Sequence, residues 1–210
     1  MNRIARAVSR SGGLAVGTAL LLTAGPRDRL TAQDSVPPGY GTLRRDEITV
    51  RFTTGEVELQ VLPLDEQVIR LLAPDTYQSL TQLIQAQRAA IDTAARRAGL
   101  TRPTLVMVTV LGLVPQARFN PDDLEIQSRG RLFRPLAIVP LSPTWGAHQL
   151  DARQQAVALY LFEEGISFRE ALTVSYQGRP NDAWGRSVRV LERERARAAA
   201  RAQARERPSP

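Results

Sequence analysis

The sequence predicts a mainly β (α+β) protein, an antiparallel β-sandwich with an N-terminal hairpin, one long amphipathic helix and a C-terminal helix. Three observations lead to this fold class. Short apolar segments recur between turn residues from 104 to 177, residues 48–61 alternate apolar with polar, and residues 75–98 repeat apolar side chains at helical spacing. With 210 residues and a hydrophobic fraction of 43%, the chain is long enough for one domain with a substantial core.

Residues 104–146 form the centre of the predicted sandwich. The segment TLVMVTVLG (104–112) is continuously apolar and rich in β-branched residues, which predicts a strand covered on both faces. Alternation over 124–128 predicts another strand. Residues 132–139 predict a third, which Pro135 interrupts, so it is either an edge strand or a bulged one.

Two later segments, 155–164 and 170–178, also alternate, and Gly165 and Gly178 follow them. The total is about seven strands, five of them between 104 and 177. This pattern fits a sandwich of immunoglobulin-like type. Because strands do not alternate with helices along the chain, Rossmann and TIM-barrel folds are excluded.

The region before residue 104 supplies the hairpin and the long helix. Two alternating runs around a Thr-Thr-Gly turn predict a hairpin over 47–61. Residues 66–72 fit either a short helix or a strand. A helix is predicted over 75–98, because Asp75 can cap its start and Gly99 follows its end. Its single apolar stripe favours a helix that covers a sheet over one that binds a partner.

Residues 1–33 have the pattern of a secretory signal peptide, with a positive start, a short apolar run and small residues after it. Cleavage is predicted after Gly25 or Gln33. We favour Gln33, because the following Pro/Gly-rich residues 34–46 are typical of a linker. An uncleaved signal anchor is the alternative. The protein is therefore expected in the periplasm or outside the cell. It is not a lipoprotein, since the chain has no cysteine.

The net charge of +7 is unevenly distributed. Residues 1–33 carry +4 and residues 186–210 carry +5, which leaves −2 for residues 34–185. The globular domain, predicted over 47–185, is therefore not a basic nucleic-acid-binding surface, and no nucleic acid partner is expected. All 28 basic residues are arginines, which excludes lysine chemistry.

Residues 186–210 are predicted to form a basic helix or tail. Trp184, Val188 and Leu191 share one helical face, and Asp182 can cap the helix. The first two turns should dock on the domain. Beyond them the apolar stripe thins to alanines, so the remainder is predicted to project into solvent.

Residues with chemical potential are few. The only histidine, His148, lies in a loop, and no G-x-S-x-G motif accompanies it. Asp122, Asp123 and Glu163 could supply an acidic site, but no calcium-loop or metal-ligand spacing occurs, so no cofactor and no metal are expected. Loops 115–123 and 142–150 are better candidates for contact than for chemistry. The predicted partner contacts are Asn120, Asp122, Asp123, Trp145, His148, Arg193, Arg197 and Arg201.

The strand order also carries a resemblance. A long apolar strand is followed by F-x-P-x-D-L-x-I-x-S-x-G-R, a strand beside a proline, a loop, a strand ending Leu-Phe-Glu-Glu and a closing strand. Residues 104–177 thereby resemble the bacterial extracytoplasmic immunoglobulin-like domains of unassigned function. The resemblance implies a sandwich used for binding or structure rather than catalysis, and it transfers no functional residue.

The function expected from the sequence is that of a non-catalytic, exported envelope protein that binds another protein or a cell-wall component, or has a structural or assembly role. One alternative is an uncharacterised hydrolase with a site around Asp122, Asp123, His148 and Glu163. A second is a protein that binds an anionic polymer or membrane surface through its arginine-rich tail.

Overall fold

The computed structural model describes residues 36–206. The fold described here belongs to the unit of residues 35–210. The predicted signal peptide, residues 1–33, and both of its candidate cleavage points lie outside the described residues. So do residues 207–210, at the end of the predicted tail.

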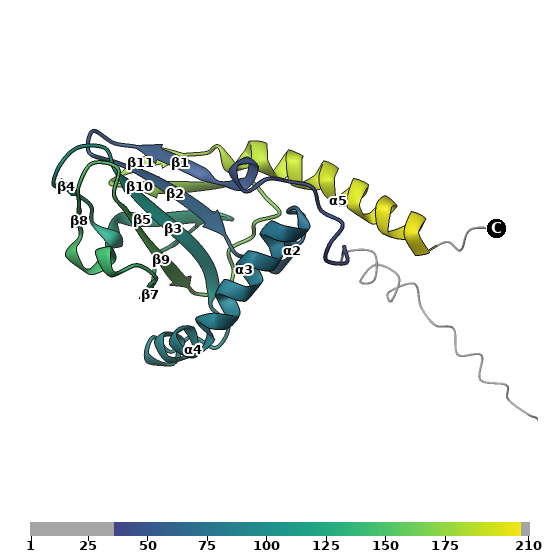
Figure 1. The fold of residues 1–210 in the computed structure, drawn as a ribbon, viewed down its shortest axis with the longest axis horizontal. Coiled ribbons are helices and arrows are strands. Elements are labelled where there is room, and N and C mark those ends of the chain that lie inside the picture. Colours follow the sequence, from purple (N-terminus) through teal and green to yellow (C-terminus); the bar gives the residue numbers. More distant parts are fainter. Residues whose placement is uncertain (1–35, 207–210) are drawn as a thin grey trace, which may run out of the picture. The chain divides into compact units, whose positions relative to one another are not determined.

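A five-stranded antiparallel sheet forms the larger layer (Figure 1). Its central strand is the apolar segment that the sequence predicts to be covered on both faces. The alternating residues before position 61 form the predicted hairpin at one edge. In spatial order the strands are β1 (Val50–Thr53), β2 (Val57–Pro63), β3 (Thr104–Gly112), β9 (Gln155–Phe162) and β7 (Ala137–Pro140).

A second antiparallel sheet has four strands, and two further short strands pair with each other. The four-stranded order is β11 (Arg179–Asn181), β10 (Leu172–Tyr176), β5 (Leu124–Ser128) and β6 (Arg131–Phe133). The isolated pair is β4 (Ala117–Arg118) with β8 (Gln149–Leu150). The described residues thus contain eleven strands rather than about seven, because β4, β8 and β11 lie in segments expected to be loops or turns and one expected strand is divided in two.

The strand expected over 132–139 is divided between the two sheets. Pro135 separates β6 from β7, and the chain crosses from the four-stranded to the five-stranded sheet at this point. Proline has no backbone N–H for a strand ladder, so a break is expected there. The edge position predicted for this segment is confirmed, since both β6 and β7 are edge strands.

Side chains from both sheets belong to one continuous core. Val108 and Ala158, neighbours across β3 and β9, are fully buried in it together with Ile126 of β5. The hydroxyl of Tyr160 donates a hydrogen bond of 2.9 Å to the carbonyl of Pro121, just before β5. Burial raises the pKa of Tyr160, which therefore stays protonated and keeps this bond.

Helices cover part of the outer face of the five-stranded sheet. The ambiguous segment 66–72 contains a short helix, α2 (Glu66–Ile69). The helix predicted over 75–98 is instead two helices, α3 (Pro74–Ala86) and α4 (Arg88–Arg97). The chain leaves helical geometry at Gln87, with φ −94° and ψ 4°. The break lets α4 turn so that it contacts β7 and buries Ile91.

Three short 3-10 helices are present: η1 (Arg45–Ile48) precedes β1, whereas η2 (Pro121–Asp123) and η3 (Pro143–Ala147) lie in connections between strands. The segment expected to be a linker, 34–46, is packed where it is described. Leu43 bridges Leu72 in parallel, and Leu43 and Val36 are both buried. We call residues 36–43 the N-terminal arm.

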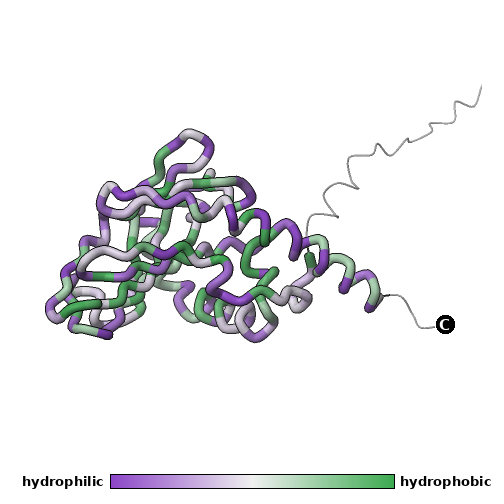
Figure 2. The backbone as a smooth tube through the Cα atoms, turned by 90° about the horizontal axis from the view of Figure 1, so that it is seen from above, coloured by the Kyte–Doolittle hydropathy of each residue, from purple (hydrophilic) through white to green (hydrophobic). Residues whose placement is uncertain are grey.

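The C-terminal helix, α5 (Trp184–Glu206), is docked over most of its length. Trp184 and Leu191 are buried, as predicted for the first two turns, but so are Ala198 and Ala202. The expectation that the helix projects into solvent after residue 191 is therefore wrong. Small alanines leave room for the N-terminal arm to lie against the helix, which the apolar pattern alone does not show. Figure 2 shows hydrophilic residues recurring along α5.

Across residues 36–206, no helix combines the length and the apolar character needed to span a membrane.

Candidate functional site

The loop carrying Asn120, Asp122 and Asp123 is held by its own hydrogen bonds. Asn120 caps η2, because its side-chain oxygen accepts from the Asp122 backbone N–H at 3.2 Å. Its amide donates to Asp123 at 2.7 Å. The two aspartates also line a surface hollow of about 590 Å³ beside the Glu125–Arg134 ion pair, which measures 2.8 Å. These side chains serve first to shape the turn that enters β5.

Trp145 and His148 lie in and after η3, and both contact Phe119. Trp145 is only 3% exposed and packs edge-on against Phe119 and Tyr160. The prediction that Trp145 contacts a partner is therefore wrong, since its ring is part of the core. His148 is exposed, in a left-handed conformation with φ 51°.

The hydrolase hypothesis requires His148 and the acidic residues to converge. Within residues 36–206 the His148 ring has no hydrogen bond or ion pair, and its recorded contact is the Phe119 ring at 5.6 Å. Glu163 pairs instead with Arg131 of β6 at 2.9 Å. The described residues contain no group of three or more histidine or acidic side chains placed to hold a metal ion.

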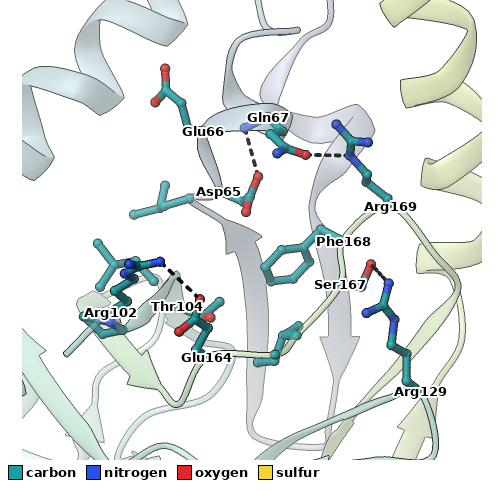
Figure 3. Close-up of a pocket in the computed structure, with 15 residues that line it drawn as sticks. Asp65, Glu66, Gln67, Arg102, Thr104, Arg129, Glu164, Ser167, Phe168 and Arg169 are labelled. Carbon is teal, nitrogen blue, oxygen red and sulfur yellow. Dashed lines mark hydrogen bonds and ion pairs between the residues drawn. The ribbon is translucent and has the colours of Figure 1, made fainter. Parts of the chain in front are cut away.

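A cleft of about 520 Å³ lies where the ends of β2, β3 and β9 meet α2, and Figure 3 shows its lining. Three arginines, each from a different connection between elements, line the cleft. The buried side chains of Ile166 and Phe168 also line it. Each guanidinium has a partner: Arg102 with Glu164 at 3.9 Å, Arg129 with Glu170 at 3.1 Å, and Arg169 with Gln67 at 2.5 Å.

The chemistry of this cleft is that of ion pairs. A hydrogen bond from Arg129 holds the pKa of the Glu170 carboxyl below its ordinary value, and Glu170 in turn raises the pKa of Arg129. Glu170 is therefore ionised at neutral pH and cannot act as a general acid there. Ser167 interacts with the same pair, at 3.4 Å from Arg129. The arginines that line the cleft therefore already have partners within the chain.

The basic surface of α5 differs, because four of its arginines have no carboxylate partner among the described residues; Arg193 donates only to the backbone carbonyl of Arg189, at 3.2 Å. Arg186, Arg189, Arg193 and Arg197 follow at spacings of three, four and four residues, which places them on one helical face. All four are exposed, and none forms an ion pair in the described part of the chain. The buried residues Leu191, Ala198 and Ala202 occupy the opposite face. We call these four arginines the basic face.

Arg201, predicted as a partner contact, points to the other side. Its guanidinium donates to the carbonyl of Tyr40 at 2.9 Å and to the carboxylate of Glu194. Glu194 is 3% exposed and also accepts from the N–H and hydroxyl of Thr42, each at 2.9 Å. This side chain holds the N-terminal arm on α5 but keeps 39% exposure, and the partner contact predicted for it stays a prediction.

Sequence reasoning named Arg193 and Arg197 but missed Arg186, Arg189 and the buried Glu194. A signal for Glu194 was present. It lies three residues after Leu191 and four before Ala198, within the apolar stripe that docks the helix. An acidic residue in such a stripe needs a buried partner.

Comparison of the chain with protein-family models, with curated proteins and with solved structures gives no match. The resemblance to immunoglobulin-like domains therefore stays a prediction.

Proposed function

We propose that this chain is a non-catalytic, exported binding module whose contact surface is the basic face of α5, and that its partner is the acidic surface of another envelope protein. The observation that carries the proposal is the set of four exposed arginines on a helix docked by its opposite side; none of the four has a carboxylate partner within residues 36–206. The two sheets are proposed to form an immunoglobulin-like sandwich that serves as the rigid support.

The shape of the basic face favours a protein partner. From Arg186 to Arg197 the helix rises by about 17 Å, which suits one side of a protein interface. The exposed residues between the arginines are Glu192 and Ala196, with no large apolar side chain among them. A membrane-surface helix needs an apolar face to insert, and α5 uses its own for docking. Arginine also binds carboxylates in a bidentate way that fits acidic side chains.

The proposal is tested with poly-L-glutamate as the acidic probe. We expect the wild-type chain to bind it in a salt-sensitive way. Replacing Arg189, Arg193 and Arg197 together by glutamine should weaken binding by about tenfold, because each exposed ion pair contributes roughly 0.2–1 kcal/mol. The matched control replaces Arg88, Arg96 and Arg97 of α4, which are also exposed, by glutamine and removes the same charge.

Equal losses in the two triple variants would show a nonspecific charge effect and overturn the proposal. Parallel measurements with anionic lipid vesicles and with double-stranded DNA separate the alternatives. Tighter binding to either one than to poly-L-glutamate, lost in the α5 variant alone, would replace the protein partner by a membrane or a nucleic acid.

A further inference from the structure

Helices cover only part of the outer face of the five-stranded sheet, which is the face that points away from the four-stranded sheet. Strand pairing places Arg51, Gln60, Thr109 and Val157 directly side by side on β1, β2, β3 and β9. All four point away from the core shared with the other sheet, because their strand neighbours Val50, Val108 and Ala158 are the buried inward residues. This row makes the floor of a polar strip across four strands.

A hollow of about 450 Å³ lies over this row. Met107, 3% exposed, adds an apolar part to its floor beside Val157. Residues Arg45 and Asp46 of η1 line the hollow as well. Its size lies within the range of small-molecule sites, and its lining is mainly polar, with Met107 and Val157 as the apolar part.

Among the described residues, the two arginines of the hollow have no counter-ions. Neither the Arg45 nor the Arg51 guanidinium makes a hydrogen bond or an ion pair within residues 36–206. Arg45 is an exposed residue, but partial burial of its guanidinium still lowers its pKa. A guanidinium that has lost part of its hydration without gaining a partner gains most from a bound anion. The cleft of Figure 3 lacks this property, because each of its arginines is paired.

The charges lining the hollow indicate the charge of the ligand. Arg45, Arg51 and Asp46 together carry +1, and Asp46 is only loosely compensated by Arg44, at 3.8 Å. A single negative charge balances this set, whereas a doubly charged phosphate would meet the Asp46 carboxylate. The amide of Gln60 and the hydroxyl of Thr109 offer hydrogen bonds between the arginines and the apolar floor.

We propose that this hollow is a binding site for a small monocarboxylate with a short apolar part, held by Arg45 and Arg51 at its carboxylate and by Met107 and Val157 along its apolar part. The site is separate from the basic face of α5 and does not depend on the function proposed for it.

The experiment follows backbone amide shifts of the chain by NMR during titration with octanoate. Octan-1-ol and inorganic phosphate are the comparison probes. We expect octanoate to shift amides at 45–51, 60, 107–109 and 155–157. Arg45→Met and Arg51→Met keep the side-chain stem and should each weaken octanoate binding by at least about tenfold. Arg97→Met on the exposed end of α4 is the matched control and should leave binding unchanged.

Three results would overturn the proposal. Octan-1-ol binding as tightly as octanoate would show that the arginines are not used. Phosphate binding more tightly than octanoate at the same amides would make the site one for inorganic anions. Octanoate shifts outside the hollow, or none at all, would remove the site. Thr109→Val is a further test, because valine has nearly the same shape as threonine but lacks the hydroxyl. This variant should weaken octanoate binding and leave the unfolding midpoint almost unchanged.

Discussion

Replacing Glu194 by alanine is expected to loosen the N-terminal arm and the second half of α5 together. The carboxylate is 3% exposed and accepts two bonds from Thr42 and one from Arg201. Loss of one partner of a buried pair costs about 3–5 kcal/mol. Here the Arg201 side chain keeps 39% exposure and Thr42 lies near solvent, so both can return to water. We therefore expect a loss of about 2–3 kcal/mol.

Urea-induced unfolding measures this loss, and a thermal scan should show a fall of about 5–10 °C in the midpoint. Limited proteolysis should cut first near residues 36–43, since the arm loses its anchor. Glu192→Ala is the matched control, because Glu192 lies on the same helix, is exposed and forms no ion pair in the described residues. A loss below about 1 kcal/mol for Glu194→Ala, or one equal to the control, would refute the assigned role.

Three other predictions concern single sites. Burial raises the pKa of Tyr160, so the folded chain keeps this proton while the unfolded chain loses it above about pH 10; stability should fall from there upward, and Tyr160→Phe should flatten that fall in urea titrations at high pH. Gly41→Ala would place a Cβ 2.2 Å from the Leu71 carbonyl carbon, so the free energy of unfolding should drop by about 1–3 kcal/mol with early proteolysis of the arm. Arg129→Gln should raise the pKa of Glu170 toward its ordinary value, as a carboxyl NMR titration would record, whereas an unchanged pKa would contradict the pairing.

The elements that the sequence predicts well are those whose signal is local. The hairpin is predicted by alternating residues and β3 by a continuous apolar run. A strand buried on one face needs apolar residues at every second position, and a strand buried on both faces needs them throughout. The break at Gln87 has no proline or glycine to mark it. It arises where α4 turns toward β7, a contact between segments about fifty residues apart.

Long-range pairings account for most of what the sequence does not reveal. The bridge from Leu43 to Leu72 turns an apparent linker into a packed arm, and that arm covers alanines that looked too small to dock α5. For the candidate site, the sequence shows the spacing of the arginines along α5. Which of these arginines face solvent depends on the N-terminal arm. Arg201 and Arg197 are four residues apart, yet only Arg201 bonds the arm.

The arm also bears on how the basic face could bind. An isolated helix of this composition would be marginal in water, and its arginines would lose conformational freedom on binding. Docking through Leu191, Glu194 and Ala198 fixes the helix before any partner arrives. The helix backbone has therefore already lost its conformational freedom when the chain folds. Binding a partner then restricts only the arginine side chains. The buried Glu194 thus supports binding through the opposite face without being able to touch the partner.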